Sequence, residues 1–190
     1  MGRSQNENQE DIQLVERRMK MFDKFGEFNS VEEMNMAAEG FLKEGDTESL
    51  YALADENGID REDAEDYANG DTEVFATLTM AVFGRLSVQE KEISKEKSVM
   101  ERMIKRQILE MVKSICTEQD MAVAIMKKGN SAEVIFQAMK KGAEKHKSKV
   151  SEKMSCGISC GTDRDLCEII KAYYLGNEKK LNERIESLYK

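Results

Sequence analysis

The stretch SLYALADENGIDREDAEDYANGD, residues 49–71, predicts two short helices joined by a tight turn. Leu50 and Leu53 give the first helix an apolar face, and Gly58 follows where a left-handed helix cap belongs. Asp60 is placed to begin the second helix as an N-cap, with more acids in its first turn, where the helix dipole favours them. A second glycine then ends this helix. We therefore expect a compact helical hairpin at this point of the chain.

The hairpin has the outline of a helix-turn-helix, but its charge has the wrong sign for reading DNA. Its second helix, 60–69, carries five acids against a single base, Arg61. Such a helix repels the phosphates that a DNA-binding protein must neutralise. A basic partner is expected instead. The predicted contact residues are seven acids: Asp55, Glu56, Asp60, Glu62, Asp63, Glu65 and Asp66.

The negative charge is concentrated around this hairpin. Residues 26–73 hold 16 acids and 2 bases, a net charge of −14, whereas the remainder has 27 bases and 21 acids, or +6. The whole chain therefore carries −8. Charges at this density repel one another, and either solubility or a basic binding partner explains why a surface would keep them.

The composition predicts an all-α fold. The 190 residues include no proline, where average usage predicts roughly nine or ten, and no alternating strand pattern is found. We expect a multi-helix bundle with more than 60% helix and a small acidic N-terminal helical module. The module is predicted at 11–88 and a second helical domain at 99–190, separated by a charged stretch, 89–98, that is a solvated helix or a linker.

Amphipathic patterns place individual helices along the chain. An apolar stripe of Met100, Ile104, Ile108, Met111 and Ile115 predicts one long helix, which is also a candidate surface for a homo-oligomer. The other predicted helices lie at 11–25 and 31–43, from 71 or 72 onward, after 117 and after 131, and at 163–175 and 178–189.

The cysteines form a weak candidate metal site. Cys156, Cys160 and Cys167 are spaced C-x3-C-x6-C, with Cys116 and His146 as possible fourth ligands. Zinc sites usually combine two knuckle-like cysteine pairs, and only one such pair is present. The spacing therefore favours free thiols, and we expect no metal and no cofactor.

No motif indicates an enzyme. The segment that begins at Asp55 has some features of a calcium loop, but Asp60 stands where the loop needs glycine, and Ile59 cannot act as a ligand. His146 is the only histidine and sits among lysines, where we expect a solvated side chain, and no glycine-rich phosphate loop occurs. We expect a protein without catalytic residues.

Targeting and membrane signals are not found in the sequence. No run of about 18 apolar residues occurs, and the first thirty residues contain no apolar signal core. Four cysteines in a chain of this length are also too few for a disulfide scaffold. We therefore expect a cytoplasmic protein that does not bind membranes.

A lysine-rich segment suggests an alternative function. Its lysines are Lys140, Lys141, Lys145, Lys147 and Lys149. They lack the interleaved aromatic residues and arginines that are typical of single-strand binding. A solvated helix face explains them, but contact with nucleic-acid phosphates or with the acidic module stays open.

The C-terminal half resembles a known family. The residues CTEQDMAVAIMKKGNSAEVIFQAMKKGAEKHKSK, 116–149, followed by DRDLCEIIKAYYLGN, 163–177, resemble the PcfK-like family of small proteins on bacterial mobile elements. Some members are anti-CRISPR proteins that inhibit the type II effector nuclease Cas9. The resemblance implies a helical fold and a non-enzymatic inhibitor of Cas9, or else a conjugation accessory protein that binds DNA through its lysines.

The charge pattern agrees with inhibition of Cas9. Cas9 holds nucleic acid in positively charged channels and reads its short recognition motif with arginines. An acidic helical module can occupy such a surface by imitating phosphates, and electrostatic steering speeds its association. If the acidic face is not the contact, Tyr173 and Tyr174 are the next candidates.

Overall fold

The computed structural model of the protein describes residues 21–150 and 157–189. Helices make up 72% of these residues and no strand occurs among them, which confirms the predicted all-α fold. The chain divides into two compact units, Met1–Glu92 and Ile93–Lys190. We call the first the acidic unit, because it has 23 acids and 9 bases, and the second the basic unit, because it has 20 bases and 14 acids. Their net charges are −14 and +6.

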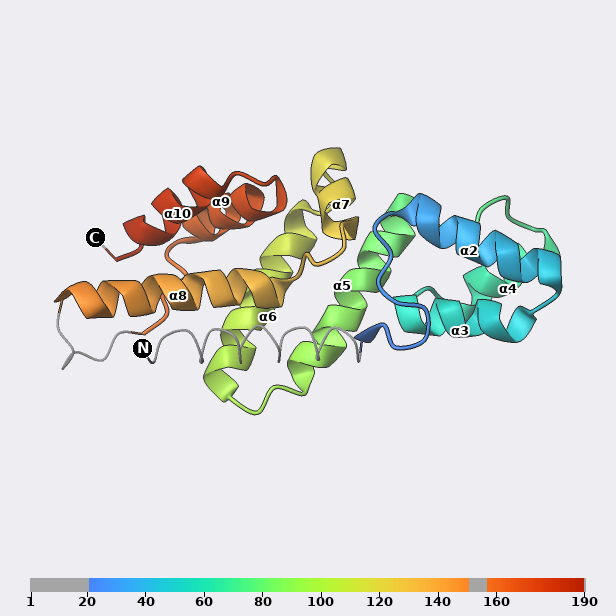
Figure 1. The fold of residues 1–190 in the computed structure, drawn as a ribbon, viewed down its shortest axis with the longest axis horizontal. Coiled ribbons are helices and arrows are strands. Elements are labelled where there is room, and N and C mark those ends of the chain that lie inside the picture. Colours follow the sequence, from blue (N-terminus) through green and yellow to red (C-terminus); the bar gives the residue numbers. More distant parts are fainter. Residues whose placement is uncertain (1–20, 151–156, 190) are drawn as a thin grey trace, which may run out of the picture. The chain divides into compact units, whose positions relative to one another are not determined.

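Within its described residues, 21–92, the acidic unit contains three short helices and the larger part of a longer one (Figure 1). The helices are α2 (Val31–Glu44), α3 (Thr47–Asn57), α4 (Arg61–Asn69) and α5 (Leu78–Ser94). Apolar residues from α2, α3 and α5, with Phe75 from the preceding loop, are almost fully buried and form the core. The core side chains include Met34, Leu50, Leu53, Phe75 and Leu86.

The helix predicted to start at 71 or 72 begins only at Leu78. The preceding loop is held by side-chain contacts instead. Asn35 of α2 donates to the carbonyl of Ala76 and accepts from its backbone N–H, both at 2.9 Å. Phe75 packs edge-on against Tyr67 with ring centroids 5.8 Å apart. These contacts hold the backbone of the loop in a non-helical conformation. The start of the helix was therefore predicted too early from the apolar pattern alone.

A buried arginine ties α5 to the segment before α2. Arg85 is only 3% exposed, and its guanidinium donates to the carbonyl oxygen of Phe28 at 2.6 Å and lies 3.4 Å from the Glu27 carboxylate. The helix predicted at 11–25 lies mostly outside the described residues, and its last part, 22–25, is not helical.

The basic unit contains the remaining helices: α6 (Val99–Ile115), α7 (Gln119–Met126), α8 (Ala132–Val150), α9 (Asp163–Tyr174) and α10 (Glu178–Ser187). α6 packs against α8 and α9, and α10 lies along both α8 and α9 (Figure 1). The core draws on all five helices, with Ile108, Ile125, Phe136, Ile169 and Ile185 among its buried residues.

The buried face of α6 differs from the predicted stripe. Lys105, Ile108, Leu109 and Val112 are the buried residues of this helix, whereas Met100 is 64% exposed. At roughly 100° per residue, the predicted stripe covers one side of α6, and its centre lies about a quarter of a turn from the centre of the buried face. Only the middle of the predicted stripe coincides with the true core face.

The charged stretch 89–98 is neither fully solvated nor a plain linker. Its first six residues complete α5, and Gln89 and Ile93 within them are buried. The connection to α6 is therefore short. Within the described ranges, the helices are too short or too polar to cross a lipid bilayer.

Candidate functional site

The predicted hairpin at 49–71 forms as α3 and α4. The side chain of Asp46 caps α3 by accepting from the backbone N–H of Ser49 at 2.9 Å. Gly58 ends α3 with a φ of 67°, a left-handed conformation that glycine adopts at little cost. Asp60 is the N-cap residue of α4, as predicted, but its side chain makes no capping hydrogen bond.

The turn between α3 and α4 rests directly on α5. A Cβ atom added to Gly58 would lie 2.6 Å from the carbonyl oxygen of Gly84, and one added to Gly84 would lie 2.3 Å from that of Asn57. Two glycines are therefore required for this backbone-to-backbone approach. The contact fixes the direction in which α4 leaves the turn, and with it the position of the acids on α4.

Six of the seven predicted contact residues present their carboxylates at the surface as expected. Asp55, Asp60, Glu62, Glu65 and Asp66 are exposed, and Asp63 is half-buried. Within the described residues, five of these carboxylates form no hydrogen bond and no ion pair. The five are Asp55, Asp60, Glu62, Asp63 and Asp66. We call these five residues the acidic face.

Glu56 has a different role from its neighbours. Its carboxylate accepts from the backbone N–H groups of Lys24 and Phe25 at 3.2 to 3.3 Å. It therefore anchors the segment before α2 to α3, and its charge is already compensated by backbone donors. Sequence reasoning could not separate Glu56 from Asp55, because the segment it binds lies about thirty residues away.

The one base of the hairpin is also engaged. The guanidinium of Arg61 lies 4.5 Å from the ring centroid of Tyr51 and 3.2 Å from the Glu65 carboxylate. Stacking on an aromatic face and pairing with one acid hold it beside α3. Arg61 therefore does not neutralise the acidic face.

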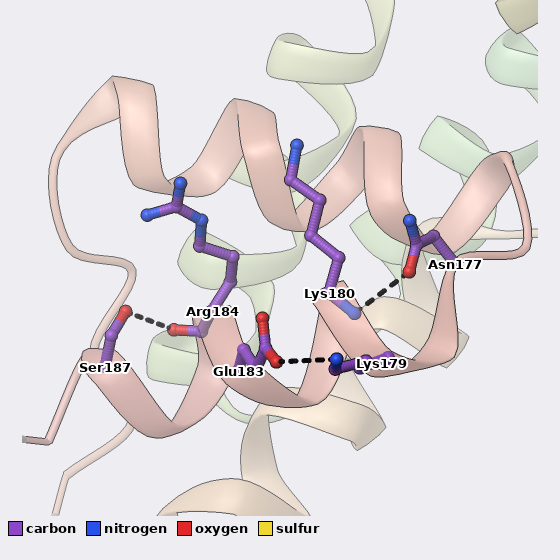
Figure 2. A pocket seen from close by; sticks show the side chains of 6 residues that line it. All are labelled: Asn177, Lys179, Lys180, Glu183, Arg184 and Ser187. Atoms are coloured by element: carbon purple, nitrogen blue, oxygen red, sulfur yellow. Dashed lines mark hydrogen bonds and ion pairs between the residues drawn. The ribbon is translucent and has the colours of Figure 1, made fainter.

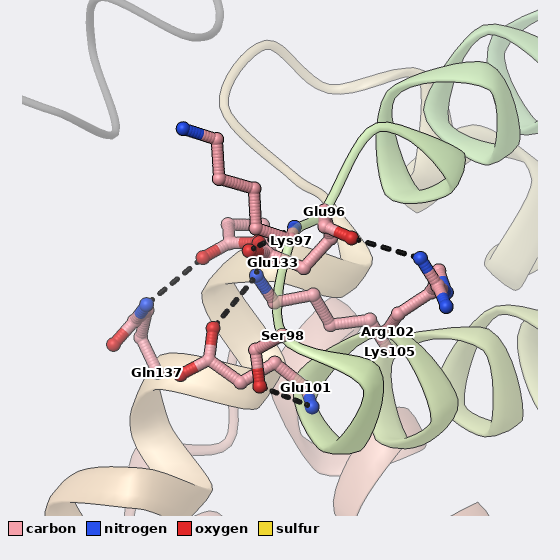
Figure 3. Close-up of polar contacts among 8 residues, drawn as sticks. All are labelled: Glu96, Lys97, Ser98, Glu101, Arg102, Lys105, Glu133 and Gln137. Carbon is pink, nitrogen blue, oxygen red and sulfur yellow. Dashed lines mark hydrogen bonds and ion pairs between the residues drawn. The ribbon is translucent and has the colours of Figure 1, made fainter.

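A second polar cluster surrounds a buried lysine of the basic unit (Figure 3). The ammonium of Lys105 is 1% exposed and lies 2.7 Å from carboxylates of both Glu96 and Glu133, and 3.7 Å from Glu101. It also lies 4.8 Å from the ring centroid of Phe136. Burial by itself lowers the pKa of Lys105, but the hydrogen bonds and charges of the two close glutamates outweigh this effect and raise it.

This cluster links three parts of the basic unit. Glu96 lies before α6, Lys105 lies within α6, and Glu133 opens α8, where it also accepts from Gln137 at 2.8 Å. Sequence reasoning missed the cluster. The signal was that Lys105 takes the first place in an i, i+3, i+4, i+7 pattern whose other members, Ile108, Leu109 and Val112, are buried.

An open trough of about 440 Å³ runs along α10 (Figure 2). It is lined by Asn177, Lys179, Lys180, Glu183, Arg184 and Ser187. Arg184 and Lys180 both contact Glu168 of α9, and Lys179 lies 4.0 Å from Glu183. Because each cation already lies beside a carboxylate, the trough is a poor binding site for an anion.

The described cysteines do not gather into a metal centre. Cys116 is buried and its Sγ contacts the carbonyl of Lys113, while Cys160 and Cys167 are half-buried free thiols. Burial raises the pKa of both Cys116 and Cys160, which makes them poor nucleophiles. No group of three potential metal ligands occurs among residues 21–150 and 157–189. Cys156 lies outside the described residues.

The remaining candidates of the C-terminal half are partly enclosed. Tyr174 is buried and Tyr173 half-buried, with their rings edge-on at 5.2 Å, so Tyr174 offers little surface to a partner. His146 was expected to be solvated, but its ring stacks on Tyr189 at 5.3 Å. Lys145 pairs with Glu186 at 3.1 Å.

Searches among family models, curated proteins and solved structures found no match to this chain. The resemblance to the PcfK-like family therefore stays a prediction. What the chain does has to be argued from the two units themselves.

Proposed function

We propose that this protein is a non-enzymatic binding protein whose acidic unit docks on a positively charged, nucleic-acid-binding surface of another protein. The observation that carries this proposal is the acidic face: five carboxylates on and beside one short helix, without a partner among the described residues. Carboxylates that stabilise a fold usually have hydrogen-bonding or ion-pair partners, as Glu56 has. Those of the acidic face have none of these partners.

The arrangement of the acidic face suits such docking. Glu62 and Asp66 project from α4 opposite its buried residues Ala64 and Tyr67. The glycine contact between the turn and α5 sets the position of α4 before any partner arrives, so little conformational entropy is lost on binding. A net charge of −14 on the acidic unit also attracts a basic surface from a distance and speeds association.

Cas9 is the partner that we propose for this surface, and inhibition of Cas9 inside a bacterial cell is the proposed activity. Two lines of support converge: the PcfK-like pattern at 116–149 and 163–177, and the acidic unit, which matches the basic channels in which Cas9 holds nucleic acid. In this proposal the carboxylates take the positions of phosphates, and DNA is excluded.

A DNA cleavage assay with Cas9 from several hosts tests the proposal. The parent protein is expected to slow cleavage by at least one effector. A variant with Asp60, Glu62, Asp63 and Asp66 replaced by lysine should inhibit at least about tenfold more weakly. The matched control replaces four other exposed acids of the acidic unit by lysine: Glu32, Glu44, Glu48 and Glu73. This control variant should inhibit like the parent.

The outcomes separate the two parts of the proposal. Cleavage that the parent leaves unchanged for every effector overturns the assignment to Cas9. Equal loss of inhibition in both variants shows that only the net charge matters and removes the acidic face as the contact. Full inhibition by both variants moves the contact away from the acidic unit.

The alternative function is DNA binding through the lysines of α8. Lys141 and Lys147 support it, because both are exposed and neither has a partner within the described residues. Their spacing of six residues, however, places them on different sides of α8, since a helix turns by roughly 100° per residue. Tight, salt-dependent binding to plain duplex DNA without any effect on Cas9 would favour this alternative.

A further inference from the structure

The first two turns of α6 expose a group of apolar side chains on the basic unit. Val99, Met100 and Met103 are 59%, 64% and 66% exposed, more than any other large apolar side chain among the described residues of this unit. At roughly 100° per residue, all three lie on the side of α6 opposite the buried Lys105 and Val112. We call Val99, Met100 and Met103 the methionine patch. Contiguous exposed apolar groups of this kind often mark interaction sites.

Positive charges flank the methionine patch. Lys97 precedes it by two residues and Arg106 follows Met103 by one turn, and both side chains are exposed. Neither has an ion-pair partner within the described residues. Figure 3 shows the Lys97 side chain extending away from the carboxylates that surround Lys105. The surface therefore combines an apolar centre with a positive rim.

The opposite side of the same turns is held in place. Ser98 caps α6 by accepting from the backbone N–H of Glu101 at 3.3 Å, and Arg102 donates to the carbonyl of Glu96 at 3.0 Å. Lys105 ties these turns to α8 through Glu133 (Figure 3). The patch is thus presented on a fixed helical turn. Methionine, with its flexible and polarisable side chain, adapts to different apolar partners.

We propose that the methionine patch is a docking site for an acidic amphipathic helix of another protein. The apolar face of such a helix covers Val99, Met100 and Met103, while its carboxylates pair with Lys97 and Arg106. Charge decides against a second copy that pairs α6 with α6, because that arrangement brings two positive rims together. The site lies on the basic unit and does not depend on the acidic face.

The test uses the full chain with isotope-labelled methionine methyl groups and two synthetic peptides. One peptide is an amphipathic helix with leucines on one face and glutamates on the other, and the second has lysine in place of every glutamate. The glutamate peptide is expected to shift the methyl signals of Met100 and Met103. The signal of Met36, a methionine on the acidic unit with 65% exposure, should stay in place.

Variants locate the contact. Replacing Arg106 by glutamate should weaken binding of the glutamate peptide about tenfold. The same change at Lys141, an exposed lysine of α8 without a partner in the described part of the chain, should leave binding unchanged. The double variant Met100→Glu with Met103→Glu should abolish binding, and Met36→Glu should not. All these positions are exposed, so circular dichroism is expected to show unchanged helix content.

Three results would overturn the proposal. The first is no shift at Met100 and Met103 with the glutamate peptide. The second is an equal shift with the lysine peptide, which shows that the rim does not select for acids. The third is a shift of the same signals when the protein alone is concentrated, which assigns the patch to self-association.

Discussion

The acidic face of the acidic unit and a set of glutamates in the basic unit have opposite surroundings. In the basic unit, glutamates are engaged by cations: Glu96 and Glu133 by the buried Lys105, and Glu118 by Lys171 at 2.8 Å. In the acidic unit, the acidic face has no such partners within the described residues. The difference supports a structural role for these three glutamates of the basic unit and leaves the carboxylates of the acidic face available for binding.

The largest expected effect comes from removing the buried cation. Replacing Lys105 by alanine leaves Glu96 and Glu133 facing each other without a counter-charge. We expect the basic unit to lose about 3 kcal/mol, the low end of the range for broken buried pairs because both glutamates keep some water contact. Chemical denaturation of the full chain, monitored by hydrogen exchange at the backbone amides of α6 and α8, measures this loss.

Lys141→Ala is the matched control in the same unit, because Lys141 is exposed and has no ion-pair partner among residues 21–150 and 157–189. Its effect should stay within about 0.5 kcal/mol. If the Lys105 variant lost less than about 1 kcal/mol in the free energy of unfolding, the network would add little to the stability of the basic unit.

A somewhat smaller effect is expected at the glycine contact of the acidic unit. Gly84→Ala places a methyl group 2.3 Å from the carbonyl oxygen of Asn57, so backbone must shift. The expected loss is about 2 kcal/mol in the free energy of unfolding. Gly40→Ala, on α2 with open space around it, should instead stabilise the unit by roughly 0.5–1 kcal/mol. Equal effects of the two variants in urea denaturation would contradict the close approach.

The neighbouring acids Asp55 and Glu56 on α3 have different roles: Glu56 supports the fold, whereas Asp55 lies on the surface. Glu56→Ala leaves two backbone N–H groups without their acceptor and is expected to cost about 1–2 kcal/mol. Asp55→Ala removes an exposed carboxylate that has no partner among the described residues, so its effect should stay within about 0.5 kcal/mol. Thermal unfolding of both variants is the measurement, and similar losses would place Asp55 in the fold as well.

The smallest effect is confined to alkaline pH. The pKa of Lys105 is raised in the folded protein by Glu133 and Glu96, against an ordinary value of about 10.4 in the unfolded chain. Its charge therefore stabilises the fold fully below that value, and this contribution disappears as pH rises through the folded pKa. The stability difference between the parent and Lys105→Met should shrink in that range, and a difference that grows with pH would contradict the assignment.

Local chemistry made much of the acidic unit predictable. Gly58 and the acids around it define two helices and a turn without reference to the rest of the chain, and both helices form there. Distant contacts were not predictable. The loop before α5 is held by Asn35, and Glu56 is bound by backbone some thirty residues earlier.

The burial of Lys105 was not predicted from the sequence, and the reason is physical. Lysine is normally exposed, so the predicted apolar stripe of α6 includes the exposed Met100 and leaves out the buried Lys105. Only the three-dimensional placement of Glu96 and Glu133 makes burial of the ammonium tolerable. Once Lys105 turns inward, Met100 and Met103 must turn outward, because they lie on the other side of the helix.

The account rests on the claim that the acidic face meets a basic partner surface. The most direct measurement is the association rate constant with guide-loaded Cas9 at increasing salt. For the parent and for the Glu32, Glu44, Glu48 and Glu73 lysine control, this rate should fall steeply as salt screens the charges. The variant with lysine at Asp60, Glu62, Asp63 and Asp66 should associate at least about tenfold more slowly at low salt. Equal rates for all three proteins, unchanged by salt, would contradict the claim.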